Sequence, residues 1–404
     1  MKLDGPHHIT MITADARRTV DFYASGLGLR LVKKTVNFDA PEAYHLYFGD
    51  ELGSPGSILT WFEFVGSPRG RAGAGMVHTI QLGVASETAL DFWAGRLADR
   101  GRESSWNERS LTFEDDDGLR IQLVVADRAD HPLRAAHPEI PPEHAIVGIE
   151  GARAYTARGA AADRELLTST LGFSELTEGE YALRGDTRSF RWGYDETGTG
   201  GIQGAGTVHH IAWHSRDEDH LDWRRRVGEA GMRATPVIDR DYFRSIYFRQ
   251  PQGILFEIAT TSPGFAVDED PEHLGEELRL PTRHAHLRPR LERQLTPLVN
   301  PRAARSGGSS GAAGDPPLGV GAGARSEDPV EAPMDVAIRG DTIRLGQLLK
   351  LAGVAASGAE ARELLAQQPA LVNGEPDARR GRQLHPGDVV VAAGAVLRVT
   401  SRGG

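Results

Sequence analysis

The sequence predicts an α+β protein in which four βαβββ units form paired, cupped sheets, followed by a small α+β domain at the C-terminal end. Three observations predict this. A strand, a helix and three further strands recur four times within residues 1–300, helix N-cap residues stand at matching places in the units, and the composition changes abruptly near residue 301. One such unit buries only one face of its sheet, so we expect the units to pair.

The first two units carry the clearest pattern. In unit one, HHITMIT alternates as a strand, Asp15 is a good helix N-cap, and the amphipathic helix ARRTVDFYASGLG ends at Gly26 or Gly28. LRLVKKTVNF, YHLYFGD and SILTWFEF follow as strands. Unit two runs from the strand MVHTIQLGV through the helix SETALDFWAGRLADRG to the strand LRIQLVVAD.

The third and fourth units repeat the order with a weaker pattern. Unit three begins near AIVGIEGARAYT, has its helix around Ala160–Leu171 and ends near RSFRWGYD. Unit four begins with VHHIAWHS, continues through the helix EDHLDWRRRVGEAG and ends at GILFEIAT. We therefore expect one half of the body at residues 1–140 (units one and two) and the other at 141–300 (units three and four).

The remaining residues divide into a linker and a tail. Gly, Ala, Pro and Ser dominate residues 301–334, which predicts a flexible linker, and residues 335–404 form a separate small domain. The 404-residue chain contains no cysteine, so disulfides and thiolate chemistry are excluded and any metal must bind His, Asp or Glu. Its net charge of −10 argues against a generally basic nucleic-acid binder. No membrane-spanning stretch or secretory signal is evident, which predicts a cytoplasmic protein.

Two histidines occupy the same place in the repeat. Asp15 lies seven residues after His8, and Asp217 lies seven residues after His210. Because side chains alternate along a strand, both histidines are expected on the same face of their strands. The cap Ser86 places Thr79 at this position in unit two, and unit three offers an aliphatic residue near Ile149. His7, His78 and His209 are then expected on the opposite face, whereas His214 shares the face of His210.

A carboxylate stands in one of the last strands. When PGSILTWFEF, DDGLRIQLVV and PQGILFEIAT are superposed on their turns, Glu257 matches Trp61 and Gln122. A lone histidine in a strand is more often structural than a ligand. Two histidines in repeat register and one carboxylate in an apolar run, however, form the facial triad of non-haem iron(II) oxygenases. The sequence predicts a metal site at His8, His210 and Glu257 that binds Fe(II), with Mn(II) as the alternative.

Residues 1–300 resemble the vicinal-oxygen-chelate superfamily of glyoxalases, bleomycin-resistance proteins and extradiol dioxygenases, and within it the hydroquinone-type ring-cleaving dioxygenases. The resemblance rests on GPHHIT, YHLYFGDELGSPGS, GTVHHIAW, DRDYFRSIYFR, GILFEIATTSPGF and VDEDPEHLGEEL. It implies the same three ligands and pocket roles for His7, Thr10, Arg240 and Tyr247. The first unit, rather than the third, supplies a histidine, which fits the hydroquinone group better than the catechol group.

The resemblance implies that the body opens a hydroquinone- or catechol-like aromatic diol with O₂. Arg240 would stabilise a phenolate or a developing oxyanion, and Tyr247 or His7 would donate or accept a proton. Two alternatives remain: a glyoxalase-type metal isomerase, which usually has four ligands, and a non-catalytic binding protein of the same fold. The resemblance also suggests a homodimer.

The tail contains LVNGE and RRGRQLHPGD, which resemble the small αL RNA-binding motif first known from a ribosomal small-subunit protein. IRLGQLLKLAG is expected as a helix closed by Gly353, SGAEARELLAQ as a second helix capped by Ser357, and ALVNGE as a strand and a tight turn. The resemblance implies RNA contacts by five basic residues: Lys350, Arg362, Arg379, Arg380 and Arg382. The alternative is a solvated charged face.

Overall fold

A computed structural model of the chain describes residues 1–107, 109–126, 130–302, 334–338, 342–352, 354, 361–362, 364–365, 370–373, 375–392 and 395–401. The chain divides into two compact units, Met1–Ala312 and Ala313–Gly404, which we call the body and the tail. Of the predicted linker at 301–334, only residues 301, 302 and 334 belong to the described residues.

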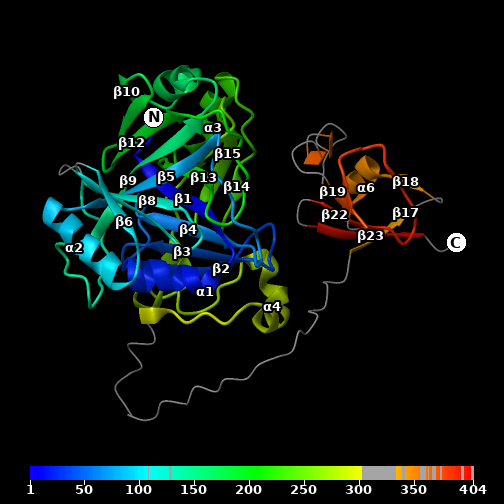
Figure 1. Cartoon of the computed structure of the whole chain (residues 1–404), viewed down its shortest axis with the longest axis horizontal. Helices are drawn as coiled ribbons and strands as arrows, with labels where there is room; N and C mark the ends of the chain where they lie inside the picture. Colours follow the sequence, from blue (N-terminus) through cyan, green and yellow to red (C-terminus); the bar gives the residue numbers. More distant parts are fainter. Residues whose placement is uncertain are drawn as a thin grey trace, which may run out of the picture. The chain divides into compact units, whose positions relative to one another are not determined.

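The body contains the four predicted βαβββ units, which confirms the fold class (Figure 1). Unit one comprises β1 (Pro6–Thr13), α1 (Ala16–Val20) with a π-helical turn (Asp21–Gly26), β2 (Arg30–Val36), β3 (Tyr44–Gly49) and β4 (Ile58–Glu63). Unit two comprises β5 (Met76–Val84), α2 (Glu87–Asp99), β6 (Ser104–Asn107), β7 (Ser110–Glu114) and β8 (Arg120–Val125).

The second half of the body repeats this order. Unit three comprises β9 (Ile146–Thr156), helical turns at Ala160–Asp163 and Leu166–Thr170, β10 (Ser174–Thr177), β11 (Glu180–Arg184) and β12 (Ser189–Glu196). Unit four comprises β13 (Val208–His214), α3 (His220–Glu229), β14 (Ile238–Asp239), β15 (Arg244–Arg249) and β16 (Leu255–Ala259).

The units pair across the sequence rather than along it. One eight-stranded sheet has the order β14-β15-β16-β13-β1-β4-β3-β2 and joins unit four to unit one. The other has the order β10-β11-β12-β9-β5-β8-β7-β6 and joins unit three to unit two. Each sheet therefore takes one unit from each of the sequence halves 1–140 and 141–300, and those halves are not separate compact bodies. We call the two sheets the first and the second sheet.

Both sheets turn one face toward a shared apolar core. Along β1, Ile9 and Met11 are fully buried in this core, whereas His8 and Thr10 point to the other, concave face of the first sheet. The helices α1 and α2 lie on the outside of the strands (Figure 1). Five tryptophans are almost completely buried and provide much of the apolar area: Trp61, Trp93, Trp192, Trp213 and Trp223.

Of the helix caps that the sequence predicts in the body, Asp15 and Ser86 are confirmed and Asp217 is not. Asp15 accepts hydrogen bonds from the backbone of Arg17 and Arg18, and Ser86 accepts one from Ala89. The prediction for Asp217 was wrong, because α3 begins two residues later, after Asp219. The Asp217 carboxylate instead accepts the backbone N–H of Thr261 at 3.1 Å and so fixes the end of β16.

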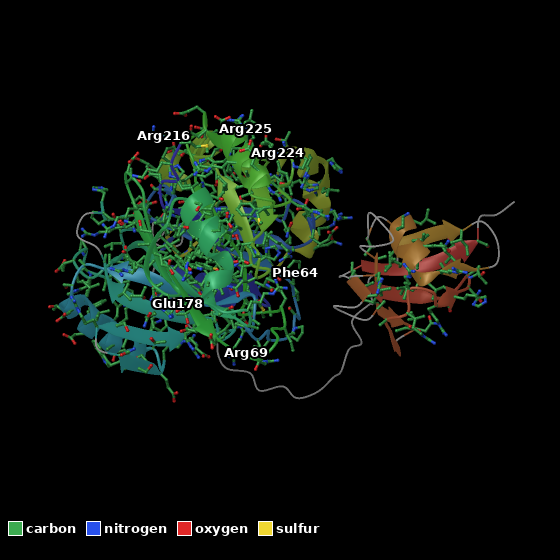
Figure 2. The ribbon with its side chains drawn as sticks, turned by 90° about the horizontal axis from the view of Figure 1, so that it is seen from above. Phe64, Arg69, Glu178, Arg216, Arg224 and Arg225 are labelled. Atoms are coloured by element: carbon green, nitrogen blue, oxygen red, sulfur yellow. The ribbon has the colours of Figure 1, made fainter. Side chains whose placement is uncertain are left out.

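The outer side of α3 carries a run of arginines. Figure 2 shows Arg224 and Arg225 projecting from the surface of the body. Arg225 forms ion pairs with Asp222 and Glu229, and Arg224 donates to the carbonyl oxygen of Thr235. Carboxylates of its own helix therefore offset the charge of Arg225, whereas Arg224 is held by a backbone carbonyl oxygen outside the helix. Among the described residues, no helix is long and apolar enough to cross a membrane.

The segment 265–302 covers the edge strand β2, which would otherwise present unpaired backbone groups. The Lys33 ammonium, fully buried on β2, contacts the Asp268 carboxylate at 2.6 Å, the Glu269 carboxylate and the carbonyl oxygen of Phe265 at 2.9 Å. Further along, Arg302 forms a bidentate ion pair with Glu51, with both distances 2.7 Å. The segment is thus fastened to unit one at both ends.

The tail has a five-stranded sheet with the order β17-β23-β22-β19-β20, and a two-stranded sheet of β18 and β21. Its elements are β17 (Met334–Ile338), β18 (Ile343–Arg344), α6 (Leu345–Leu351), β19 (Ala370–Val372), β20 (Glu375–Asp377), β21 (Gln383–Leu384), β22 (Val389–Ala392) and β23 (Ala395–Ser401). The first predicted helix and the turn after ALV are confirmed; Asn373 makes that turn with a φ of 52°. Gly353 and Ser357 lie outside the described residues.

Lys33 gives a stability prediction. Lys33→Ala leaves Glu269, whose side chain is 2 % exposed, buried beside only Arg279 at 3.7 Å, and an uncompensated buried charge is strongly destabilising. We expect the body to lose about 3–5 kcal/mol of unfolding free energy in urea denaturation. Lys2→Ala, which removes a half-exposed pair with Asp186, is the control and should change stability by less than about 1 kcal/mol. Equal effects of the two substitutions would contradict this account.

Candidate metal centre

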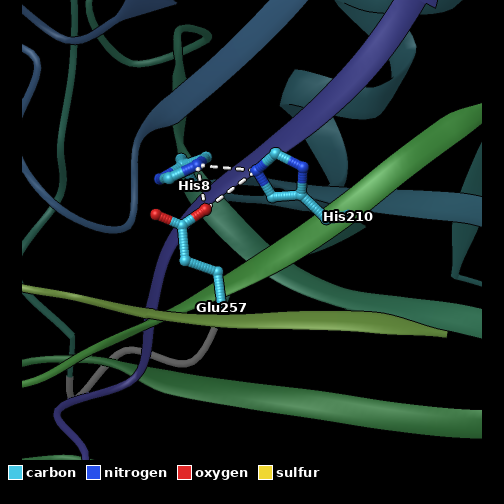
Figure 3. A group of neighbouring side chains, drawn as sticks. All are labelled: His8, His210 and Glu257. Atoms are coloured by element: carbon cyan, nitrogen blue, oxygen red, sulfur yellow. Dashed lines mark hydrogen bonds and ion pairs between the residues drawn. The ribbon is translucent and has the colours of Figure 1, made fainter. Parts of the chain in front are cut away.

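His8, His210 and Glu257 meet on the concave face of the first sheet (Figure 3). His8 lies on β1, His210 on β13 and Glu257 on β16, and all three side chains are at most 5 % exposed. The Glu257 Oε2 atom lies 3.2 Å from His8 Nε2 and 2.9 Å from His210 Nε2, and the two nitrogens are 3.2 Å apart. Among the described residues, no other group of three His, Asp or Glu side chains converges in this way.

Irregular strand pairing turns neighbouring histidines toward the same face. The ladder between β1 and β13 skips His7 on one strand and His209 on the other, so both residues sit at β-bulges. His7 Nδ1 lies 2.9 Å from His8 Nδ1, and His209 Nδ1 lies 2.8 Å from His210 Nδ1. The expectation that His7 and His209 face away from the ligands was wrong, because strict alternation does not hold through a bulge.

The hydrogen bonds of His7 determine which nitrogen of His8 is free. The Thr260 carbonyl oxygen can only accept, so His7 Nε2, 3.0 Å away, must carry the proton. Burial and the neighbouring His8 lower the pKa of His7 well below its usual value, so His7 is neutral and its Nδ1 is bare. That nitrogen accepts from His8 Nδ1–H, which leaves the lone pair of His8 Nε2 directed at Glu257 and His210.

Glu257 is held as a carboxylate. Its Oε1 atom accepts a short hydrogen bond from the Ser245 hydroxyl, and Oε2 has no hydrogen-bond partner among the described residues. Although burial acts in the opposite direction, His8 and His210 hold the pKa of Glu257 well below its usual range. For His210, burial lowers the pKa, which favours the neutral form of its imidazole.

These three residues fit a divalent metal ion. Two imidazole nitrogens and one carboxylate oxygen converge at one buried point, and a cation there would offset the cost of burying the carboxylate. Their separations of 2.9–3.2 Å match the spacing of about 3 Å expected between adjacent donors that each lie about 2.1 Å from one ion. The donor set of two histidines and one carboxylate is that of the facial triad of iron(II) oxygenases.

Thr10 and Tyr247 contact His210 from two sides. Thr10 Oγ1 lies 2.9 Å from His210 Nε2, and the Tyr247 ring meets the His210 imidazole edge to face, with centroids 5.7 Å apart. Arg240 donates from Nε to the Tyr247 hydroxyl at 3.2 Å and forms an ion pair with Asp39 at 3.3 Å. The structure therefore brings all four sequence-predicted pocket residues beside the triad, with His7 behind His8.

In β4, the residue that corresponds to Glu257 is not the one that the sequence alignment predicts. The β13–β16 ladder pairs Ala212 with Glu257, and the β1–β4 ladder pairs Thr10 with Thr60. Thr10 follows His8 by two residues, as Ala212 follows His210, so Thr60 is the counterpart of Glu257. The match of Trp61 to Glu257 was wrong by one residue, because Trp61 points into the core.

The second sheet has lost these ligands. Its β5–β9 ladder pairs Gln81 with Gly151, which places Gly151 where the first sheet has His210, rather than the aliphatic residue expected near Ile149. A Cβ atom at Gly151 would lie 2.2 Å from the Gln81 amide oxygen. Gln81 in turn donates to Gln122, the residue that matches Glu257, at 2.6 Å. Packed amide side chains therefore occupy the position of the metal site.

Some site residues were not found from the sequence. Ser245 contacts Glu257 of the triad, and Thr60 contacts its neighbour Thr10. In the sequence, only the alternation of side chains along β15 and β4 indicates that these two residues face the site. The repeated doublet His-His, in GPHHIT and TVHHIAW, was the available sign that His209 supports His210 as His7 supports His8. His214, which shares the predicted face, is not a member of the triad; its Nε2 lies 2.5 Å from the Thr261 hydroxyl.

In the tail, Arg379, Arg380 and Arg382 lie in one exposed turn. The carbonyl oxygens of Arg380 and Arg382 accept the backbone N–H groups of Gly346 and Leu345 at the start of α6. Arg379 also forms an ion pair with Asp377, with an Nη2–Oδ2 distance of 2.6 Å. Lys350, at the end of α6, and Arg362 are both exposed and helical.

Comparison with known proteins identifies both parts of the chain. The profile of the Glyoxalase/Bleomycin resistance protein/Dioxygenase superfamily matches residues 5–123, and that of the S4 domain matches residues 336–400. The "Putative ring-cleaving dioxygenase MhqO" of Bacillus subtilis is 41% identical over 308 residues, covering 73% of this chain and 97% of the relative. The "Chlorohydroquinone/hydroquinone 1,2-dioxygenase" of Sphingobium indicum is 32% identical, covering 69% and 92%.

A crystal structure of a "putative dioxygenase" from Bacillus subtilis superposes with a TM-score of 0.69 at 39% identity, covering 73% of this chain and 97% of that one. The chain belongs to the glyoxalase/bleomycin resistance protein/dioxygenase superfamily. Within it, the body is a member of the group of ring-cleaving dioxygenase relatives, and it is joined to a C-terminal S4 domain.

The triad predicts how metal binding responds to substitution. Glu257→Gln keeps the shape of the side chain but removes the charge that offsets the cation, and His210→Ala removes one ligand. We expect anaerobically purified wild type to hold one iron(II) per chain and both variants to hold less than about a tenth of that, as measured by elemental analysis after desalting. His214→Ala, outside the triad, is the matched control and should keep its iron. Full iron in Glu257→Gln would contradict the triad.

Proposed function

We propose that the body is an iron(II)-dependent, extradiol-type dioxygenase that opens the ring of hydroquinone- or catechol-like aromatic diols. The observation that carries this proposal is the convergence of two imidazole nitrogens and one carboxylate oxygen at one buried point of the first sheet. When bound by His8, His210 and Glu257, iron(II) would supply neighbouring coordination positions for a substrate oxygen and O₂ and a route for electrons between them. The same donors suit manganese(II), the alternative ion.

Aromatic side chains give the site an apolar wall. The Phe243 ring lies against His8 with centroids 5.3 Å apart, and the Phe62 ring lies 4.4 Å from that of His45. Such walls suit a planar ring and displace water from it. The similarity to a relative named as a chlorohydroquinone and hydroquinone dioxygenase supports hydroquinones as the first class of substrate to test.

Tyr247 and Arg240 are the residues we assign to proton transfer and charge stabilisation. Burial, with the negative charge of Glu257, raises the pKa of Tyr247, so its hydroxyl stays protonated at neutral pH and can donate. Arg240 remains cationic beside it and can stabilise a negative oxygen on the ring. His7 is better suited to orienting His8, because Thr260 and His8 engage both of its ring nitrogens.

For the tail we infer RNA binding through the arginine turn 379–382. The S4 profile match supports it, and so does the turn itself, in which three exposed guanidinium groups stand beside the start of α6. Such groups contact phosphates, and the exposed Lys350 and Arg362 would extend the surface. Assembly as a homodimer stays a prediction from the family resemblance.

The catalytic proposal is tested by O₂ uptake. Anaerobically iron(II)-loaded protein is offered hydroquinone, methylhydroquinone, chlorohydroquinone and catechol, and an oxygen electrode measures consumption. We expect uptake with the hydroquinones and a loss of at least about 10³-fold in His210→Ala, because the ion that joins substrate and O₂ is lost. Tyr247→Phe and Arg240→Gln should retain iron and lose about 10²- to 10³-fold.

The outcome of this assay separates the alternatives. If the wild type holds one iron per chain and consumes no O₂ with any of the four phenols, the dioxygenase proposal is wrong and a binding protein of this fold is the better account. Turnover that needs no O₂ would instead point to isomerase chemistry.

The RNA proposal is tested by filter binding of the full-length protein to structured ribosomal RNA fragments. Because phosphate contacts release counterions, we expect retention at 50 mM salt and clear weakening at 200 mM. The triple variant Arg379→Gln/Arg380→Gln/Arg382→Gln should bind at least tenfold more weakly and lower the salt slope by about 2–3. The variant Arg224→Gln/Arg225→Gln, on α3 of the body, is the control. No retention at 50 mM would rule out RNA binding by this turn.

A further inference from the structure

A chain of hydrogen bonds runs across the concave face of the first sheet to the metal centre. The Tyr47 hydroxyl lies 2.9 Å from His45 Nδ1, and His45 Nε2 lies 2.9 Å from Thr60 Oγ1. Thr60 donates to Thr10 Oγ1 at 2.9 Å, and Thr10 Oγ1 lies 2.9 Å from His210 Nε2. Of the residues in this chain, Tyr47, His45 and Thr60 are not among the predicted site residues.

Strand register builds this chain. The β3–β4 ladder places Tyr47 opposite Thr60, and the β1–β4 ladder places Thr60 beside Thr10. Side chains directly opposite in a sheet share a face, so the residues of three adjacent strands line up toward His210. His45 is 7 % exposed, and Tyr47, Thr60 and Thr10 are 1 % exposed or less, so water competes little for these hydrogen bonds.

The hydrogen bond from Thr60 to Thr10 determines the direction of the other bonds in the chain. A hydroxyl has one hydrogen, and that of Thr60 is given to Thr10, so His45 Nε2 must donate to Thr60. Burial lowers the pKa of His45 well below its usual value, so the imidazole is neutral and its Nδ1 is bare. That nitrogen accepts from the Tyr47 hydroxyl. All four hydrogens therefore point toward the metal centre.

The last hydrogen of the chain belongs to Thr10. It is directed at His210 Nε2, 2.9 Å away. A metal ion on that nitrogen would take its lone pair, and the Thr10 hydroxyl would need another acceptor on the same face. Thr10 could not turn its hydrogen to Thr60 instead, because the Thr60 hydroxyl already directs its own hydrogen at Thr10.

We propose that His45 is a positioning residue: through Thr60 it makes Thr10 an obligate hydrogen-bond donor to an oxygen of the bound aromatic diol. The inference rests on the proposed function above and deepens it. A fixed donor favours a ligand oxygen that accepts, such as a phenolate, over a hydroxyl that still has its proton to donate. Hydrogen bonds in series also polarise one another, which strengthens the last member.

The experiment measures binding without turnover. Iron(II)-loaded full-length protein is titrated under anaerobic conditions with nitrohydroquinone, whose visible band shifts when a hydroxyl ionises. For the wild type we expect saturable binding with the band of the ionised form. Thr10→Val should weaken binding about tenfold or more, the usual effect of losing a hydrogen bond to a charged group. Thr60→Val and His45→Phe should weaken it about threefold or more and reduce the ionised band.

Coupling distinguishes a chain from separate structural effects. Because Thr60 acts only through Thr10, the double variant Thr10→Val/Thr60→Val should bind no more weakly than Thr10→Val. Thr60→Ser should restore wild-type binding. Thr35→Val is the matched control, because Thr35 lies opposite His45 on β2 and its buried hydroxyl has no hydrogen-bond partner among the described residues. If His45→Phe does not fold, the Thr60 variants carry the test.

Four outcomes would overturn the inference. The first is that Thr60→Val binds the probe as the wild type does, and the second is that its effect adds fully to that of Thr10→Val. The third is that Thr60→Val loses iron, which would mean that the hydrogen bonds support only the metal site. If the wild type gives no spectral change despite full iron, the proposed function itself fails and the inference fails with it.

The tautomer of His45 can be observed without metal or substrate. Imidazole ¹⁵N spectra of the metal-free protein should show His45 protonated at Nε2, with its signal identified by the change that Tyr47→Phe causes. Protonation at Nδ1 would reverse the chain and overturn the proposal.

Discussion

The antiparallel pairing of β1 with β13 is the constraint on which the rest of the body depends. It joins the first unit to the fourth, and the second sheet repeats the arrangement by pairing β5 with β9. The two bulges in the β1–β13 ladder turn His7 and His209 to the side of His8 and His210. Each ligand ring is thereby held from behind by a neighbouring imidazole, and its free nitrogen is presented to Glu257.

The convergence of His8, His210 and Glu257 could be predicted from the sequence, because the position of a residue in the repeat can be recognised even when an element boundary is placed slightly wrongly. Asp217 is not the cap of α3, yet the correspondence of His210 to His8 holds, since each histidine is the third residue of its strand. What depends on pairing between distant strands could not be predicted. The bulge at His7 and the union of units one and four are fixed by contacts between segments about 200 residues apart. The choice of Thr60 over Trp61 is fixed by the pairing of β1 with β4, in which Thr10 lies opposite Thr60. No local pattern records such contacts.

The two sheets show how one repeat can serve two purposes. Gly151 and Gln122 stand in the second sheet where His210 and Glu257 stand in the first, and Gln81 fills the space between them. A glycine there admits the neighbouring amide, so the loss of a ligand is compensated by packing. The second sheet therefore stabilises the body through the shared core, whereas His8, His210 and Glu257 lie in the first sheet.

The origin of the ligands has a consequence for biosynthesis. His8 is made long before Glu257 and the segment that covers β2, which are added after four-fifths of the body has been made. A growing chain therefore cannot close the centre until β16 has been added, so loading must follow the synthesis of most of the body. A bound ion would then favour chains whose body is complete, and products truncated before β16 would remain metal-free and exposed to proteolysis.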